Sequence, residues 1–307
     1  MRTSIFLLLS TALFWTQPAA AGDQKTLAPI QGEQLRGIRA SHTFSITLHR
    51  SDDASRNGVS LTIDERLEPY LKASVSGGIL RLGFEELPKE LQNTANWSCP
   101  ATADVTLSRL DRIDLSGMAS VRTSDTFSGT APQIDLSGMS RVEALTISVV
   151  GGGKPDIDVS GMSRIDLTLR NPMSGVEVDA SGMSHVRLTL DGKVDATKID
   201  ISGKSRVDLS VSETAAMEIE ASGLSTVSAS GKADRLEAEV SGNSNLDLGN
   251  LTVAEADCEA TGMSSIVCRV TQGIDASASG KSSIRVHADR TIRMKTEAST
   301  MSKITFE

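Results

Sequence analysis

The chain has 307 residues, a formal net charge of −8 and an aromatic content of only 3%. This diffuse acidic balance excludes the basic face that nucleic-acid binding requires and disfavours an anionic membrane surface. A compact globular core normally takes much of its volume from aromatic side chains, but none lies between Phe127 and Phe306. We therefore expect a thin core of Val, Ile, Leu, Ala and Met.

The first 21 residues have the three parts of a secretory signal peptide. Arg2 supplies a positive charge, Ile5–Trp15 is an apolar run, and 18–21 reads Pro-Ala-Ala-Ala, a small-residue cleavage site. The apolar run is too short to span a bilayer as a helix, and no second run of membrane length follows it. The sequence predicts an exported protein of the periplasm or cell surface that does not span the membrane, with a flexible segment over 22–34.

Residues 35–100 contain strand signals without a regular repeat. Apolar and polar residues alternate over 45–48, 59–63 and 78–84, which is typical of β-strands. We interpret 35–100 as irregular capping coils for the repeats that follow, because the open end of a stack of strands exposes unpaired edges that must be covered.

From residue 101 to 307 a short phrase recurs ten times. It reads Asp-Leu-Ser-Gly-Met-Ser-Arg-Val at 135–142 and Asp-Val-Ser-Gly-Met-Ser-Arg-Ile at 158–165, and successive glycines are 18 to 23 residues apart. Such a fixed period indicates a repeat architecture. The flanks alternate with period two, as in 157–169, so a β-strand is expected on each side of a Ser-Gly-x-Ser corner.

A period of about 20 residues with two or more short strands matches one coil of a right-handed parallel β-helix, so we expect an all-β solenoid. We disfavour a β-propeller, whose blades need about 40 residues and four antiparallel strands. Adjacent coils would pair about 4.8 Å apart, so equivalent residues stack in columns. We expect the corner serines to share hydroxyl hydrogen bonds. We also expect a methionine column to fill the flat interior, namely Met118, Met139, Met162, Met183, Met263 and Met301.

One of the expected columns is acidic. A carboxylate stands two residues before the corner hydroxyl residue in nine of the ten copies, and its members include Asp135, Asp158, Asp179, Asp200 and Glu220. Like charges stacked along a sheet repel one another, so something must offset them.

Two interpretations of the acidic column stay open. One is a Ca²⁺ site, since Ca²⁺ takes several oxygen ligands. The other, which we favour, is pairing with a partly basic column beyond the corner, which contains Arg141, Arg164, His185, Arg206 and Lys303. The calcium interpretation is weakened because the sequence lacks the glycine-rich nonapeptide of calcium-binding β-rolls.

The three cysteines leave at least one thiol without an intrachain partner. Cys258 and Cys268 fall on inward positions before and after one corner, whereas Cys99 precedes the regular coils. Either a disulfide across one coil or a pair of buried thiols fits these positions. We favour the disulfide, because export permits it.

The segment 37–46, the segment 61–73 with the Gly-Ile-Leu that begins at Gly78, and the repeated corners together resemble the head GIN domain of putative auto-transporter adhesins. The resemblance covers residues 35–307. It implies a right-handed β-helix on an exported adhesin, with no catalytic residues to carry over. The corners here are more numerous and regular than is typical of the family, and many have Met at the third place, which suggests a longer rod.

These observations favour a non-catalytic binding module without a cofactor that recognises a glycan or a protein of the cell envelope. A structural or assembly component of the periplasm or outer envelope is the alternative. A polysaccharide-acting β-helix enzyme ranks third, because the regular coils lack aromatic side chains for sugar stacking. For a bound glycan we expect a position near the cap, around Tyr70, Phe84 and Trp97. The sequence does not fix the oligomeric state.

Overall fold

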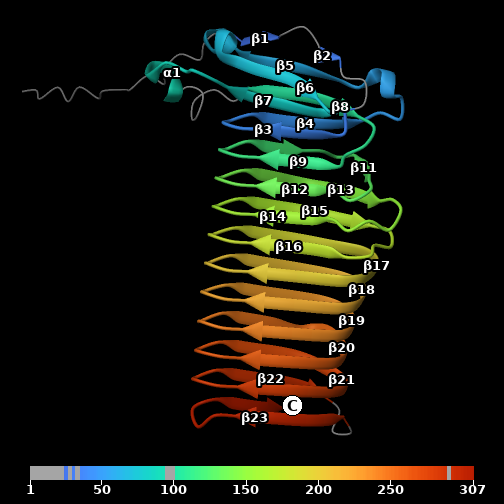
Figure 1. Ribbon diagram of the computed structural model, residues 1–307, viewed down its shortest axis with the longest axis vertical. Coiled ribbons are helices and arrows are strands. Elements are labelled where there is room, and N and C mark those ends of the chain that lie inside the picture. Colours follow the sequence, from blue (N-terminus) through green and yellow to red (C-terminus); the bar gives the residue numbers. More distant parts are fainter. Residues whose placement is uncertain (1–23, 27–29, 32–34, 94–100, 289–291) are drawn as a thin grey trace, which may run out of the picture.

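The computed structural model describes residues 24–26, 30–31, 35–93, 101–288 and 292–307. Its strands stack into a right-handed parallel β-solenoid of about ten turns, which confirms the expected fold (Figure 1). The strands that precede the corners run across the front of Figure 1 toward the left, and the chain then returns behind them as it descends. The predicted signal peptide lies outside the described residues.

Each regular coil has one strand before its corner and one after it. We call the sheet formed by the strands before the corners the approach sheet, and the sheet formed by those after the corners the return sheet. In the upper coils the two are separate strands: β9 (Arg112–Leu115), β10 (Ser120–Arg122), β11 (Thr126–Gly129), β12 (Gln133–Leu136), β13 (Arg141–Val149), β14 (Asp156–Val159), β15 (Arg164–Arg170) and β16 (Val176–Ala180).

In the lower coils one long strand begins in the return sheet, bends, and ends in the approach sheet of the next coil. These strands are β17 (His185–Ile201), β18 (Arg206–Ala221), β19 (Thr226–Val240), β20 (Asn245–Ala260) and β21 (Ser265–Ala278). The stack ends with β22 (Ser283–Ala288), β23 (Arg293–Ala298) and β24 (Lys303–Phe306).

Neighbouring coils pair in parallel with equivalent residues opposite one another, so that Ile134 lies against Ile157 and Val142 against Ile165. These inward residues are almost completely buried. Below Phe127 the buried hydrophobic residues are Val, Ile, Leu, Ala, Met and Cys. The expectation of a thin core without aromatics is therefore confirmed for the regular coils, apart from the place of most methionines.

The corners stack by direct backbone contact. The N–H of Met183 donates to the carbonyl oxygen of Gly161 at 2.7 Å, and the corners above and below repeat this bond. The corner glycines have φ between +68° and +78°, a region that favours glycine. A Cβ added to Gly182 would lie 2.6 Å from the Gly161 oxygen. The corner therefore needs glycine both for its φ and for the closeness of the next coil.

The last residue of each corner points into the solenoid, and it is a serine in every regular corner but the first, where it is Ala119. Ser140 and Ser163 share a hydroxyl hydrogen bond of 3.2 Å, and Ser184 donates to Ser205 at 3.1 Å. In the lower coils the hydroxyls donate to backbone carbonyls instead, as Ser282 does to Ala260 at 2.8 Å. The expected serine column is confirmed, and it fills the corner side of the interior without leaving these buried hydroxyls unpaired.

The expectation that the methionine column fills the interior is wrong. The side chains of Met139, Met162, Met183, Met263 and Met301 are 40% to 68% exposed and lie along the outer edge of the corners. The glycine at positive φ reverses the chain, so the residue after it projects outward and the following serine takes the inward place.

The N-terminal part covers the upper end of the stack. The first coil with a corner consists of β3 (Gly37–Ala40) and β4 (Ser45–Arg50), and it pairs directly with β9 and β10. On its outer side lie β7 (Ile79–Phe84) and β8 (Thr102–Leu107), closed by the antiparallel strands β5 (Gly58–Asp64) and β6 (Leu71–Ser76). β8 therefore lies between β4 and β5 at this end of the stack.

Short elements complete the cap. They are β1 (Gln24–Thr26), β2 (Ile30–Gln31), the 3₁₀ helices η1 (Ala54–Arg56) and η2 (Glu65–Tyr70), and the helix α1 (Lys89–Asn93). β1 and β2 pair with the outer edge of β5, opposite β8. An outward sheet edge at this end is thereby covered.

Cys258 and Cys268 are free thiols in the structure and both are fully buried. They lie on the two strands of one coil and share a hydrogen bond across the core. This hydrogen bond, together with burial, raises the pKa of the Cys258 thiol well above its usual range. The disulfide favoured from the sequence is not formed here. Cys99 lies outside the described residues.

Because both thiols are fully buried, we expect neither Cys258 nor Cys268 to react with an alkylating reagent in the folded chain, and both to react in denaturant without reductant. Peptide mass spectrometry after labelling counts each position separately. Failure of both to react in denaturant would show that they are joined as a disulfide.

The corner geometry predicts that replacing a corner glycine by alanine destabilises the fold strongly, whereas replacing a loop glycine destabilises it only slightly. Gly182→Ala should lower the free energy of unfolding by about 2–4 kcal/mol, because it adds a backbone clash to the cost of positive φ. Gly151→Ala is the matched control. Gly151 has the same φ of +77° but nothing within 4 Å of its Cβ position, so about 1 kcal/mol is expected. Equal losses in urea denaturation would contradict the role of the close approach.

Candidate functional site

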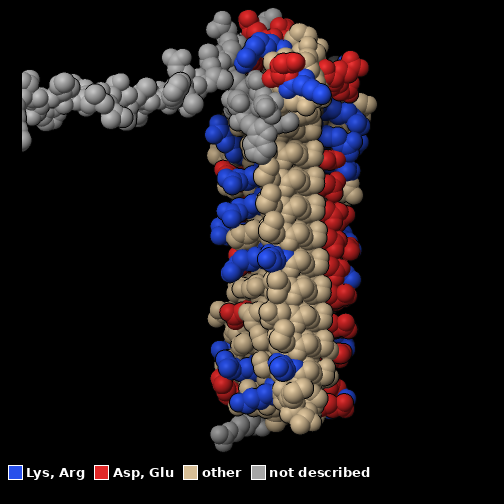
Figure 2. Space-filling model, turned by 90° about the vertical axis from the view of Figure 1, so that its left-hand side faces the viewer, with Lys and Arg blue, Asp and Glu red and all other residues tan. Residues whose placement is uncertain are grey.

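The strand register brings the recurring carboxylates into one column on the outer side of the approach sheet. We call this column the acidic ladder. Its members, from the cap downward, are Asp114, Asp135, Asp158, Asp179, Asp200, Glu220, Glu239, Glu259 and Glu297, with Ser277 before the last. Figure 2 shows the ladder as a line of acidic side chains along the right margin. The expected stacking is therefore confirmed.

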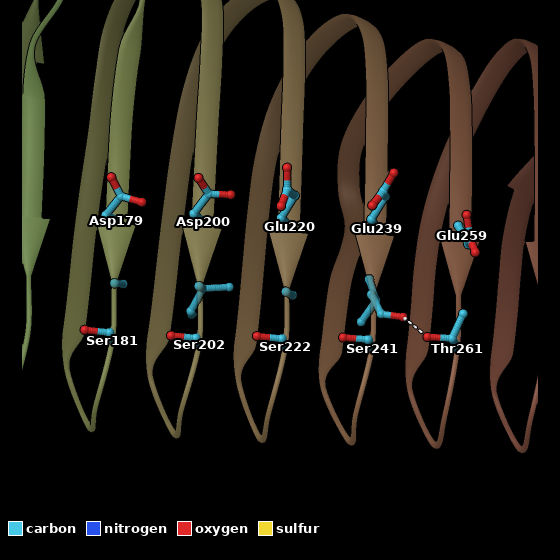
Figure 3. Close-up of a pocket in the computed structure, with 14 residues that line it drawn as sticks. Asp179, Ser181, Asp200, Ser202, Glu220, Ser222, Glu239, Ser241, Glu259 and Thr261 are labelled. Carbon is cyan, nitrogen blue, oxygen red and sulfur yellow. Dashed lines mark hydrogen bonds between the residues drawn. The ribbon is translucent and has the colours of Figure 1, made fainter.

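A row of hydroxyls runs beside the lower part of the ladder. It consists of the first residue of each corner: Ser181, Ser202, Ser222, Ser241 and Thr261. Between the row and the ladder lies a shallow groove with a volume of about 330 Å³ (Figure 3). Each of five successive coils gives this groove one carboxylate and one hydroxyl, from Asp179 with Ser181 to Glu259 with Thr261.

Cations from the same sheet offset the ladder at two places. Near the cap, Arg39 Nε lies 2.6 Å from Asp114 Oδ2, and Arg112 Nη2 lies 2.7 Å from Asp135 Oδ2. Lower down, Lys198 Nζ lies 3.6 Å from Asp200 Oδ2, and it also contacts Glu220 at 3.7 Å. Arg39 belongs to the coil above Asp114, and Arg112 and Lys198 come from the column two residues before the ladder.

The basic column beyond the corner does not neutralise the ladder, so that expectation is wrong. Arg141, Arg164, His185, Arg206 and Lys303 stack on the return sheet. Their ion pairs are made there: Arg141 with Glu143 at 3.3 Å, and both Arg206 and His185 with Asp208 at 3.0 and 2.9 Å. Since the corner reverses the chain, outward side chains before and after it point to opposite faces.

Asp158 and Asp179 lie between the two clusters of cations. Desolvation, followed by the charges of Asp158 and Asp200, raises the pKa of Asp179 to about 6. Desolvation and the charge of Asp156 also raise the pKa of Asp158. Carboxylate oxygens of Asp156, Asp158 and Asp179 lie within 4.8 Å of one another. These three carboxylates therefore repel one another, and none of them forms an ion pair among the described residues.

The five carboxylates expected from the sequence as metal ligands are not brought together as one set. Asp135 contacts Arg112, and Asp200 and Glu220 contact Lys198. Asp158 and Asp179 instead join Asp156, which belongs to the neighbouring column. The calcium interpretation stays a prediction, confined to these three carboxylates, whose hard oxygens suit Ca²⁺.

Two of the three aromatic residues expected around a bound glycan lie within the described part of the chain. Phe84 is only 6% exposed and stacks on Phe44 with ring centroids 5.2 Å apart, so it offers little surface to a sugar. The alternation of β7 places it inward, in the core of the cap. Tyr70 is partly buried against the same core at the end of η2. Trp97 lies outside the described residues.

The groove was not foreseen from the sequence, although its elements were visible there. The first corner residue is Ser or Thr in every copy, but the sequence alone does not show that its hydroxyl lines the same groove as the carboxylates. Carboxylates accept hydrogen bonds from hydroxyl and ammonium groups, and hydroxyls both donate and accept. Repeated at the coil spacing of about 4.8 Å, these groups suit an extended ligand with regularly placed donors.

The raised pKa of Asp179 predicts a pH-dependent stabilisation by Asp179→Asn. A carboxyl whose pKa is higher in the folded than in the unfolded chain destabilises the fold above the folded value of about 6, and this penalty disappears below the unfolded value of 3.8. We expect the variant to raise Tm by about 2 °C or more at pH 7.5, since solvent screens part of the effect, and by nothing near pH 3.5.

The control for this prediction is Asp166→Asn. Asp166 lies on the return sheet, where Arg187 is 3.5 Å away. This change removes an ion pair instead of a repulsion, so no gain in Tm is expected at either pH. A Tm gain for Asp179→Asn that is independent of pH would contradict charge repulsion as its cause.

Several solved structures are similar to the chain. A putative adhesin from Parabacteroides distasonis has 15% identity and a TM-score of 0.49, over 92% of this chain and 98% of that one. A putative adhesin from Parabacteroides merdae has 16% identity and a TM-score of 0.49, over 93% and 97%. A protein from Parabacteroides distasonis named as a putative lipid-binding protein has 18% identity and a TM-score of 0.46, over 92% and 97%. At these identities and scores they say nothing of the ligand of this chain.

No curated protein matches the chain. One family does, over residues 34–168 and again over 163–289, which together cover most of the sequence. The two matches include the upper coils, the corners and most of the acidic ladder. The chain therefore belongs to the family described as putative auto-transporter adhesin, head GIN domain.

Proposed function

We propose that the chain is an exported, non-catalytic adhesion module that binds an extended glycan or protein segment in the groove between the acidic ladder and the hydroxyl row. The observation that carries this proposal is the fivefold repetition of one carboxylate and one hydroxyl per coil along a single groove. A periodic surface offers the same contacts to each unit of a linear ligand, so many weak contacts add up. The family description as an adhesin supports the same reading.

The chemistry of the groove favours neutral or basic ligands. Carboxylates at neutral pH only accept hydrogen bonds, so they select hydroxyl and ammonium groups and repel carboxylated or sulfated polymers. Cell-surface glycans with free hydroxyls or amines, and extended Lys-rich protein segments, have this character.

The periodicity also argues for binding over catalysis. Acid–base catalysis uses two groups whose surroundings push their pKa values apart within one constellation. Successive coils instead place the same type of residue, a carboxylate, at the equivalent position of the acidic ladder. The high pKa of Asp179 follows from desolvation and like-charged neighbours on the same column. A polysaccharide-acting enzyme therefore still ranks third.

Export, to the periplasm or the cell surface, is part of the proposal. It is supported by the signal-peptide pattern of residues 1–21 and by the family description. Within the described parts of the chain, no helix is long and apolar enough to cross a membrane. A structural or assembly component of the envelope remains the second candidate, since a regular rod serves that role equally well.

We expect the secreted chain to bind neutral or amino-containing glycans, or Lys-rich peptides, and to ignore sulfated and uronic acid polymers on an array. Glu239→Gln combined with Glu259→Gln should weaken this binding at least tenfold, because two of the five carboxylates that line the groove lose their charge. The control pair, Asp166→Asn with Asp247→Asn, changes two carboxylates on the return sheet and should leave binding unchanged.

If the native chain binds neither glycans nor peptides, the role as a structural or assembly component is favoured. If both variant pairs lose binding equally, the groove is not the binding site. The array is run with and without Ca²⁺. Calcium-dependent binding that Asp158→Asn abolishes would support an ion at the three clustered carboxylates.

A further inference from the structure

The outer edge of the corners carries methionines in consecutive coils, partly exposed at Met118 and exposed at the next three. Met118, Met139, Met162 and Met183 occupy the third place of four successive corners, and we call them the methionine ridge. The exposed fraction rises from 40% at Met139 to 57% at Met183. In Figure 2 this edge faces the viewer as a band of mostly uncharged residues between the acidic ladder and the Lys and Arg residues of the return sheet.

The fold does not require methionine at these positions. Lys204, Leu224, Asn243 and Lys281 take the same place in other corners, and their N–H groups make the same bond to the glycine above at 2.7 or 2.8 Å. Polar residues thus serve the corner equally well, and they avoid exposing a large apolar side chain. What methionine adds to this edge is its thioether sulfur.

The ridge presents these sulfurs at a spacing that suits shared coordination. Because the corners stack in register, successive Cα atoms follow at about 4.8 Å. Three rotatable bonds let each side chain lean toward its neighbour, so three adjacent sulfurs can meet one ion. Thioethers are soft, neutral ligands that select Cu(I) among the biological first-row metals, and Ag(I) shares this preference for soft donors.

We propose that the methionine ridge is a binding site for a soft monovalent metal ion, Cu(I) or Ag(I), held by thioethers from three successive coils. The three most exposed ridge methionines are Met139, Met162 and Met183, and Met162 is the middle one of these three. Met263 and Met301 have no methionine in the corner directly above, where Asn243 and Lys281 stand. They therefore lack the partners that shared coordination needs. This site is separate from the acidic groove and does not depend on the proposed function.

Charge alone would not select a cation at the ridge. On the approach side the coils of Met139, Met162 and Met183 carry ladder carboxylates, but on the return side they carry Arg141, Arg164 and His185. The field across the ridge is therefore bipolar. The selectivity that we propose comes from sulfur, so hard cations such as Ca²⁺ should not compete.

The test uses the full chain labelled with ¹³C at its methionine methyl groups and titrated with Ag(I). We expect the resonances of Met139, Met162 and Met183 to shift at Ag(I) concentrations at least tenfold below those that shift Met263 and Met301. Reading the methyl groups separates this site from silver bound to cysteine thiols. An excess of Ca²⁺ should leave the shifts unchanged, and an anaerobic Cu(I) titration should reproduce them.

Met162→Leu keeps an apolar side chain of similar size but removes the central sulfur, and Leu224 shows that the corner accepts leucine. It should weaken Ag(I) binding at the remaining ridge methyl groups at least tenfold, whereas the control Met263→Leu should leave it unchanged. Uniform shifts of all exposed methionines, or unchanged affinity in Met162→Leu, would overturn the proposal and leave the ridge as an apolar contact surface.

Discussion

The backbone hydrogen bond between successive corners is the contact on which the rest of this structure depends. The N–H after each corner glycine donates to the carbonyl oxygen at the same place in the coil above, as between Met183 and Gly161 at 2.7 Å, and that residue is a glycine except above the first regular corner, where it is His42. Only a chain without Cβ at positive φ permits this approach. It aligns the corners of successive coils, and register shifts farther along the strands, such as the one between Val142 and Leu145, leave this alignment unchanged. The core columns, the serine column, the acidic ladder and the methionine ridge all follow from that one alignment.

The same alignment stabilises the inside of the solenoid and destabilises its outer surface. Inward columns place aliphatic residues on aliphatic residues, and the hydrophobic stabilisation grows with every coil. Outward columns stack like charges, which is unfavourable. Arg112 and Lys198 offset the acidic ladder at two places and leave Asp158 and Asp179 between them. Because this repulsion destabilises the fold, the acidic ladder is better explained by a role in ligand binding than by a role in stability.

Much of the fold can be predicted from the sequence, because the repeat indicates both the length of a coil and the position of its corner. The Ser-Gly-x-Ser period, the alternation around it and the column of Asp135, Asp158 and Asp179 lead to a right-handed β-helix in the correct register. The side on which a corner residue points was not predictable from period two, since the glycine at positive φ breaks the alternation. The methionines were therefore placed inside, and the Arg141 column was assigned to the wrong face.

Contacts between segments that are distant in the chain also could not be predicted from the sequence. Arg39 offsets a carboxylate 75 residues away in the chain, at Asp114, because the first coil is inserted between the cap and the regular stack. The stacking of Phe84 on Phe44 is equally invisible in the sequence, because 40 residues separate the two rings. Both depend on the order of coils in space, which differs from their order along the chain.

Hydrogen exchange at the corners reports directly on the backbone bond between successive corners. We expect slow exchange for the amides of Met139, Met162, Met183 and Lys204, although their side chains are exposed, because each N–H is bonded to the coil above. Protection should be comparable to that of the adjoining strands and should be lost locally in Gly182→Ala. Fast exchange of these amides in the native chain, at the rate of an unstructured turn, would contradict the corner contact as the source of the register.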